Sequence, residues 1–234
     1  MDRAFLRVMT YNIHGGLDRL GRPSLLQAGE TIARSGAALA GLQEVELAFR
    51  ARSGFADQPA ILSASLGLDC RFAPALDRKP GARGSKFGNA LLSVWPVLRS
   101  WSYPLPGRGE PRVLLAGLVE TPEGRIHFLV THLGLDSLDR ALQVRTIMAH
   151  AAPLPGPLIL AGDLNAPPGA PELAPLFAVW QEAQTAAGLD LPTFPPAGAR
   201  IDYLFFSSHW RIRAARVVPS PASDHWPLVA DAEL

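Results

Sequence analysis

The sequence predicts an α/β protein in which mixed β-sheets are covered by helices. Segments with strand character outnumber helical ones; some follow one another through tight turns, whereas others are joined by helices. A composition of 48% hydrophobic and 18% charged residues is compatible with a sizeable core and not with disorder. The 22 prolines are scattered rather than gathered in a linker, and no repeat of fixed period occurs. We therefore expect residues 1–234 to form one domain.

The strands are predicted from short apolar runs and from the turn signals between them. The two runs on either side of residues 121–124 are joined by Thr-Pro-Glu-Gly, in which proline and glycine favour a hairpin turn. The run at residues 158–161 is apolar throughout, as in a strand buried on both faces. In chain order, we expect strands at residues 5–12, 37–43, 71–74, 89–94, 97–103, 113–120, 125–132, 158–162, 201–206, 212–218 and 227–231.

Three helices are predicted from the residues at their ends. The first begins at Pro23 and Ser24 and ends at about residue 35, before a glycine. The second covers residues 58–66, with Asp57 as its N-cap and another glycine after it. Asp136 caps the third helix, which extends to about residue 150 with apolar residues at near-helical spacing. The segment between residues 163 and 200 is expected to be rich in loops, with short helical pieces.

Charge and cysteine content exclude several classes of protein. The net charge is +1, so any attraction to phosphate must be local. The single cysteine, Cys70, excludes an internal disulfide framework and a cysteine zinc site, and we expect it to be a small buried hydrophobe. No apolar run has the length of a membrane helix, and the first residues lack the apolar core of a signal peptide. We therefore expect a cytoplasmic protein with no membrane anchor.

Polar side chains gather at the points where predicted strands end. Asp163 and Asn165 follow the buried run at residues 158–161, and two prolines come directly after them. Because alternate side chains share a face of an extended chain, the two are expected to point the same way, with Leu164 packed behind. The other polar residues at or beside strand ends are Asn12, Glu44, His132, Asp202, Asp224 and His225.

The chemistry of this set suits a divalent cation and a phosphate. Glu44, Asp163 and Asp224 are hard oxygen ligands of the kind that Mg²⁺ or Mn²⁺ takes. Asp202 and His225 would form an acid–imidazole pair that sets the tautomer and stabilises the imidazolium. Each residue alone is also typical of a turn, or of a core histidine with satisfied partners. Their repetition favours a shared site, because buried acidic groups need partners.

Seven motifs extend this pattern over nearly the whole chain, from Thr10 to Leu228. They occur in the order seen in the endonuclease/exonuclease/phosphatase superfamily, which includes DNase I and exonuclease III. The resemblance implies a four-layer α/β sandwich: two mixed β-sheets face to face, helices outside, and the active site at one end. The motifs are TYNIHGG, LQEV, FGNALLS, THLGL, AGDLNAPP, RIDYLFFS and SDHWPL.

The resemblance also implies roles for individual residues. Glu44 would be the main metal ligand, with Asn12 beside it as a further ligand, and Asp224 and Asp163 would complete the acidic site. Asp163 would also position or deprotonate the attacking water, and Asp202 would pair with His225. Whether Asp163 or His225 is the general base remains open at this point. The residues expected to contact phosphate are Asn165, His132, Arg112 and Asn89.

These residues predict a monomeric, Mg²⁺-dependent phosphodiester hydrolase, with Mn²⁺ as a substitute and a nuclease acting on DNA or RNA as the leading hypothesis. One alternative is a phospholipid head-group phosphodiesterase of the sphingomyelinase type, for which Trp95, Trp101 and Trp180 are candidates for an exposed apolar lip. Another alternative is a phosphatase of small phosphoesters. A non-catalytic module is disfavoured, because clustered carboxylates without a metal repel one another.

A basic segment, residues 77–86, bears on the choice of substrate. It carries four cationic side chains and leads into the FGNALLS motif, so we expect it to bind a nucleic-acid strand near the catalytic residues. The alternative is an ordinary solvated loop. The cations are Arg78, Lys79, Arg83 and Lys86.

Overall fold

The computed structural model describes residues 5–78 and 84–234. All the predicted strands are present, and a short further strand, β9, lies in the segment expected to be loop-rich. The strands are β1 Leu6–Asn12, β2 Leu39–Leu47, β3 Asp69–Asp77, β4 Lys86–Ser93, β5 Val97–Leu105, β6 Arg112–Thr121, β7 Gly124–His132, β8 Leu158–Asp163, β9 Gln181–Glu182, β10 Asp202–Phe206, β11 Arg211–Val217 and β12 Leu228–Glu233.

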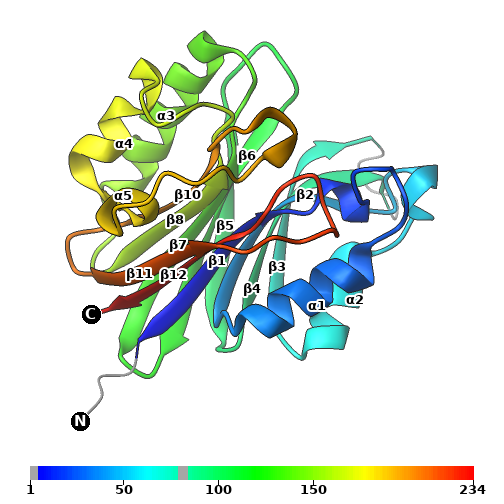
Figure 1. The fold of residues 1–234 in the computed structure, drawn as a ribbon, viewed down its shortest axis with the longest axis horizontal. Helices are drawn as coiled ribbons and strands as arrows, with labels where there is room; N and C mark the ends of the chain where they lie inside the picture. Colours follow the sequence, from blue (N-terminus) through cyan, green and yellow to red (C-terminus); the bar gives the residue numbers. More distant parts are fainter. Residues whose placement is uncertain (1–4, 79–83) are drawn as a thin grey trace.

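These strands form two six-stranded sheets that pack face to face (Figure 1). The first sheet has the order β11-β12-β1-β2-β4-β3, and the second has the order β5-β6-β7-β8-β10-β9. Both sheets are mixed, since β1 pairs with β2 and β7 with β8 in parallel, while β1–β12 and β8–β10 are antiparallel. With helices on the outer faces, this arrangement confirms the expected four-layer α/β sandwich.

Helices cover the outer face of each sheet. On the first sheet lie α1 Leu25–Ser35 and α2 Gln58–Leu66, and on the second lie α3 Ser137–Ala151 and α4 Ala174–Val179 (Figure 1). The short helix α5 Ala183–Ala186 packs at the edge of the sandwich, against β10 and β11. The expected caps of the longer helices are confirmed: Asp57 accepts a hydrogen bond from the backbone of Ala60, and Asp136 accepts two at the start of α3. Among the described residues, no helix combines the length and the apolar character needed to cross a membrane.

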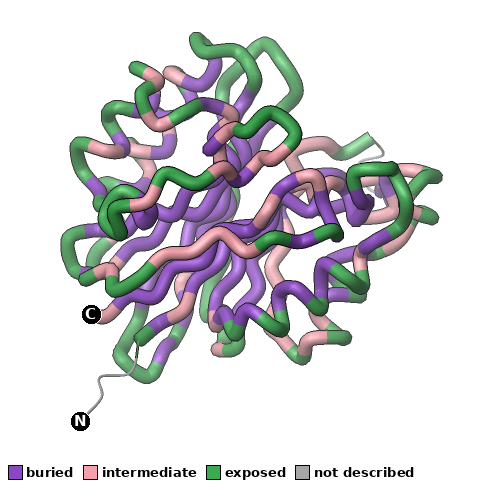
Figure 2. The backbone as a smooth tube through the Cα atoms, in the orientation of Figure 1, coloured by how far each residue is buried: buried purple, intermediate pink, exposed green. Residues whose placement is uncertain are grey.

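The core between the sheets brings the ends of β2 and β8 together. Its buried side chains include Val8 and Leu91 from the first sheet and Phe128 from the second, and the central strands are buried along their length (Figure 2). Gly41 in β2 lies so close to β8 that a Cβ atom there would be 2.8 Å from the Cβ of Ala161. This close approach occurs three residues before Glu44 and two before Asp163, so it draws their two strands together.

The end of β2 differs from the prediction. The sequence predicted that this strand ends at Glu44, but β2 continues to Leu47. Its register with β4 is interrupted between Leu42 and Val45, and Glu44 adopts a left-handed backbone with φ of 57°. Glu44 therefore lies in a β-bulge, and a bulge turns a side chain out of the regular alternation of a strand. A non-glycine residue in this conformation is strained, which is typical of functional positions.

Candidate active site

A cavity of about 350 Å³ opens at one end of the sandwich, where both sheets contribute strand ends. The parallel pairing of β7 and β8 places their carboxyl ends at the same edge, and β10 begins beside them. In this register, Asp163 is the neighbour of His132 on one side and of Asp202 on the other. The cavity is lined by Glu44, Arg50, Phe87, Glu110, Arg112, His132, Leu135, Asp163, Asn165, Phe194, Asp224 and His225.

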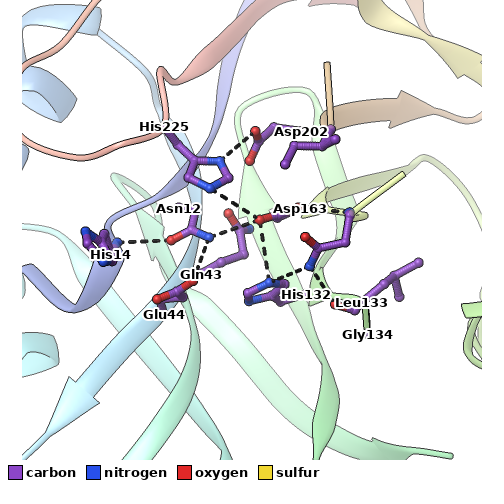
Figure 3. Close-up of polar contacts among 12 residues, drawn as sticks. Asn12, His14, Gln43, Glu44, His132, Leu133, Gly134, Asp163, Asp202 and His225 are labelled. Atoms are coloured by element: carbon purple, nitrogen blue, oxygen red, sulfur yellow. Dashed lines mark hydrogen bonds and ion pairs between the residues drawn. The ribbon is translucent and has the colours of Figure 1, made fainter. Parts of the chain in front are cut away.

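Asp163 lies at the centre of the polar network (Figure 3). Its side chain is buried, and its Oδ2 accepts a hydrogen bond from the amide of Asn12 at 3.0 Å. The same oxygen is 3.5 Å from Nε2 of His132 and 3.7 Å from Nε2 of His225. Burial, and next the negative charge of Asp202, raise the pKa of Asp163 to about 7, against the opposing influence of His225 and of the hydrogen bonds. Asp163 thus titrates near neutrality.

Asp202 and His225 form the pair that the sequence predicted to act together. Nδ1 of His225 donates to Oδ2 of Asp202 at 2.9 Å, and both side chains are buried. Burial alone would lower the pKa of His225, but the charge and hydrogen bond of Asp202, followed by the charges of Asp163 and Asp224, raise it to about 10. The imidazole is therefore protonated at neutral pH, and its Nε2–H points toward Asp163.

The loop before β12 holds His225 in place. The backbone N–H of His225 donates to Oγ of Ser223 at 3.1 Å, and that hydroxyl in turn donates to the carbonyl of Asn12 at 2.8 Å. The ring of Phe194 covers the imidazole at a centroid distance of 4.7 Å. The loop thereby ties the imidazole to the end of β1, which is the strand that carries Asn12.

His132 and Asn165 form the floor beside Asp163. The amide of Asn165 donates to the carbonyl of Leu133 at 2.9 Å and lies 3.0 Å from Nε2 of His132. Burial, then the positive charges of Arg112 and His225, hold the pKa of His132 well below its usual value, so this ring is neutral. Asn165 has φ of 50°, and its backbone N–H donates to Oδ1 of Asp163. The extended conformation predicted for residues 163–165 is therefore wrong, since the chain turns at Asn165, a residue type that tolerates positive φ.

Asn12 connects the carboxylates of the two sheets. Its amide nitrogen donates to Oε1 of Glu44 at 3.1 Å as well as to Asp163, and its amide oxygen accepts from the backbone N–H of His14 (Figure 3). The amide nitrogen of Asn12 therefore orients the Glu44 and Asp163 carboxylates, and its predicted role as a metal ligand stays a prediction. Asp224 lines the same cavity, with Oδ1 3.6 Å from Nδ1 of His14.

The residues present fit a divalent cation. Glu44 and Asp224 line one cavity, and among residues 5–78 and 84–234 neither pairs with an arginine or a lysine. Their oxygens are the hard ligands that Mg²⁺ and Mn²⁺ favour. Ligand atoms of Asp163, Asp202 and His225 also lie within 4.8 Å of one another, and Oδ1 of Asp202 is buried without a hydrogen-bond partner. In that second group, however, the imidazole and Asp202 already satisfy each other.

Of the residues predicted to contact phosphate, Arg112 lines the cavity, whereas Asn89 does not. Arg112 lines the cavity at the start of β6, pairs with Glu110 at 3.1 Å, and leaves its buried Nε without a partner. Asn89 is not among the lining residues: its amide donates to the carbonyl of Val113 at 2.9 Å. This bond joins β4 to β6 across the two sheets. Asn89 therefore lies beside the strand that carries Arg112 and not at the cavity where phosphate was predicted to bind.

Several lining residues were missed by sequence analysis. Arg50 donates to Oε1 of Glu46 at 3.1 Å, and its guanidinium lies 4.8 Å and 5.1 Å from the ring centres of Phe49 and Phe87. Phe87 belongs to the FGNALLS motif, which was a usable signal, whereas nothing in the spacing marked Phe194. The other lining residues missed were Glu110 and Leu135.

Within residues 5–78 and 84–234, the other predicted surface features do not line the cavity. In the basic segment, Arg78 lies over the ring of Phe49 and Lys86 is 3.4 Å from Asp77, while Lys79 and Arg83 lie outside the described residues. Trp95 packs against the hydrophobic core between the two sheets. Trp180 is buried in the hydrophobic cluster between the second sheet and its helices, and Trp101 packs against that same cluster. The tryptophans therefore supply no apolar lip at this cavity.

The family is decided by the match to a model described as the endonuclease/exonuclease/phosphatase family, which covers residues 9–225. The chain belongs to this family. Its members are hydrolytic phosphoesterases that generally depend on divalent metals, and every residue of the cavity network lies within the matched region. No curated protein sequence matches the chain.

Solved structures of this fold cover nearly the whole chain. An endonuclease/exonuclease/phosphatase from Beutenbergia cavernae is 26% identical, with a TM-score of 0.83, over 99% of this chain and 72% of the other. The catalytic domain of human Nocturnin, solved with a bound sulfate anion, is 22% identical, with a TM-score of 0.76, over 99% and 95%. A mannosyl-6-phosphatase from Bacteroides thetaiotaomicron is 16% identical, with a TM-score of 0.79, over 98% and 100%. The last two likenesses establish the fold.

Proposed function

We propose that this family member hydrolyses phosphodiesters with the help of Mg²⁺, for which Mn²⁺ can substitute, and that its substrate is nucleic acid. The observation that carries the proposal is the continuous network from Asp202 through His225 to Asp163, which faces a cavity also lined by Glu44 and Arg112. We further propose that the protein acts as a monomer in the cytoplasm.

Asp163 is the general base in this proposal. A general base must be within reach of the attacking water and must be ionised at the working pH, which a pKa of about 7 allows. His225 is protonated under the same conditions and cannot accept a proton, because its pKa is raised to about 10. Its imidazolium instead stabilises ionised Asp163 and offers an N–H to a phosphate oxygen. The pKa values thus favour Asp163 over His225, the two bases that the sequence left open.

The remaining polar groups bind and orient the phosphate. Arg112 offers a charged guanidinium with an unused buried N–H, and guanidinium groups bind phosphate through two hydrogen bonds. Neutral His132 and Asn165 sit beside Asp163 and restrict where a phosphate oxygen can lie. The fixed guanidinium of Arg112 favours the negative charge that develops on the phosphate oxygens in the transition state.

Glu44 and Asp224 would hold the cation at the side of the cavity formed by the first sheet. When bound, the cation would act as a Lewis acid on the phosphate oxygens. Asn12 would keep Glu44 and Asp163 at a defined separation, since it donates to both carboxylates.

Nucleic acid is favoured as the substrate by the aromatic and cationic groups at the cavity. Phe194 lines it with a partly exposed ring, and bases stack on such rings whatever their sequence. Arg50, which lies over Phe87, adds a cation at the same wall. No tryptophan lines the cavity, which weakens the lipid alternative.

The experiment is a substrate panel of DNA, RNA, phospholipid vesicles and small phosphomonoesters, assayed with Mg²⁺, with Mn²⁺ and with excess chelator. We expect cleavage of nucleic acid that stops in chelator and returns when the cation is restored. Hydrolysis of phospholipid alone, or of phosphomonoesters alone, would overturn the nucleic-acid assignment. Full activity in chelator would overturn the metal dependence.

A further inference from the structure

A second cavity, of about 450 Å³, lies directly beside the catalytic one. One wall is the loop at residues 108–110, and the other is formed by residues 134–136 and the first turns of α3. The two cavities share Glu110, Arg112 and Leu135 as lining residues. A group in the second cavity is therefore next to the predicted phosphate-binding arginine.

Buried polar side chains hold the two walls together. Asp139 of α3 accepts hydrogen bonds from the backbone N–H groups of Arg108 and Gly109, at 2.8 Å and 3.1 Å. Gln143 donates to the carbonyl of Pro106 at 3.0 Å and accepts from the N–H of Gly134 at 2.8 Å. The cavity is thus preformed, as small-molecule sites usually are.

Three leucines line this cavity while remaining exposed. Leu135, Leu138 and Leu142 expose 78%, 71% and 40% of their surface, and the last two are one helical turn apart on α3. A single exposed leucine is unremarkable, whereas a group around a cavity marks a binding site. We call this cavity, between residues 108–110 and these leucines, the leucine slot.

The polar groups of the slot are largely occupied. Asp139 is engaged by the loop, and Asp136 caps α3. Among the described residues, no acidic side chain pairs with exposed Arg108. An occupant therefore meets apolar side chains and a guanidinium, but few groups that could recognise its hydrogen-bonding edge.

We propose that the leucine slot binds the nucleoside attached to the scissile phosphate and that it does so without selecting the base. This inference rests on the proposed hydrolysis of nucleic acid. The base would pack against the leucines, with the guanidinium of Arg108 at its side, while the phosphate lies at Arg112. Apolar packing of this kind is tolerant of sequence, because every base presents an apolar face.

The shape of the slot favours a nucleoside over a lipid. Although Leu135 and Leu138 are mostly exposed, the leucines line a cavity that lies between a loop and a helix. Its volume, about 450 Å³, is that of a small-ligand site. Because it adjoins the catalytic cavity, a group covalently joined to the phosphate can reach it, and a nucleoside satisfies both conditions.

The test compares dinucleotides with otherwise identical abasic analogues that lack the base on one side of the phosphate. The variants are Leu138→Ala, Leu142→Ala and the pair together; the matched control is Leu26→Ala, a leucine 67% exposed on α1 and away from the slot. For the wild type, we expect removal of the base on one side of the phosphate to lower kcat/KM about tenfold. The factor should be the same whether that base is a purine or a pyrimidine. The double variant should cleave the complete dinucleotide more slowly and the abasic analogue at an unchanged rate. The difference in kcat/KM between the two substrates should therefore largely disappear.

Three results would overturn the inference in distinguishable ways. If the wild type cleaves nucleotides equally well with and without the base, the slot assignment fails while the proposed function stands. If the leucine variants slow both substrates equally, the leucines support the catalytic cavity rather than a base. If no nucleotide is cleaved and the variants reduce hydrolysis of phosphatidylcholine vesicles, both the slot assignment and the nucleic-acid activity fail.

Discussion

The two carboxylates joined by Asn12 lie in contrasting surroundings. Asp163, at the end of β8 in the second sheet, is 1% exposed and has its pKa raised to about 7. Glu44, on the bulge of β2 in the first sheet, is only partly buried. Burial raises the pKa of a carboxyl group, as at Asp163, whereas partial exposure leaves the Glu44 carboxylate accessible to a hydrated cation. In the proposed function, proton transfer therefore belongs to the second sheet and cation binding to the first.

The strongest way to break this division is to remove the buried carboxylate. Asp163→Asn keeps the shape of the side chain but cannot accept a proton, so kcat should fall by about 10³- to 10⁴-fold, with KM little changed. Steady-state kinetics on a cleaved substrate measure both constants. Asn165→Ala is the useful comparison, since it alters a neighbour that cannot act as a base. A loss of less than tenfold for Asp163→Asn would place the base elsewhere.

A smaller effect is expected from the pair that supports the buried carboxylate. Asp202→Asn and His225→Ala should each lower kcat by about 10²- to 10³-fold. The double variant should be scarcely worse than either single variant, because residues that act as one unit are non-additive. Kinetics of the four proteins in the cycle provide the measurement. Independent, multiplying losses would contradict the pairing seen at 2.9 Å.

On the exposed side, Glu44→Gln should act on the cation rather than on proton transfer. The variant should need about 10- to 100-fold more Mg²⁺ for half-maximal activity, with kcat largely recovered at saturating metal. Calorimetric titration of Mg²⁺ into wild type and variant gives a second measure that does not depend on turnover. An unchanged metal requirement would remove Glu44 from the cation site. Thermal unfolding should show that the fold is retained.

The smallest effect sharpens the same comparison through pH. Only ionised Asp163 can accept a proton, so its raised pKa means that activity is lost as the pH falls through about 7. At saturating metal, kcat/KM at pH 6 should be about tenfold lower than at pH 8. A pH series with substrate well below KM provides the measurement. If activity instead rose with a midpoint near 10, neutral His225 would be the base, since its pKa is about 10.

Much of the fold could be predicted from local patterns in the chain. The hairpin at residues 121–124 and the caps Asp57 and Asp136 depend on neighbouring residues alone, and all three were predicted correctly. The bulge at Glu44 could not be predicted in this way, because it depends on how β2 pairs with β4. Likewise, β9 exists only because β10 lies beside it, at a distance along the chain.

The sequence by itself determined which chemical groups are available and at which strand ends they lie. The motifs that carry Glu44, Asp163 and His225 can be recognised without knowing which segments contact one another. Only the tertiary structure decided what those groups do. It buried Asp163 between His132 and Asp202, turned Asn89 toward a backbone carbonyl, and placed exposed leucines beside Arg112. The reason is physical, because burial, charge separation and cavity shape arise from contacts between segments far apart in the chain, which no local pattern contains.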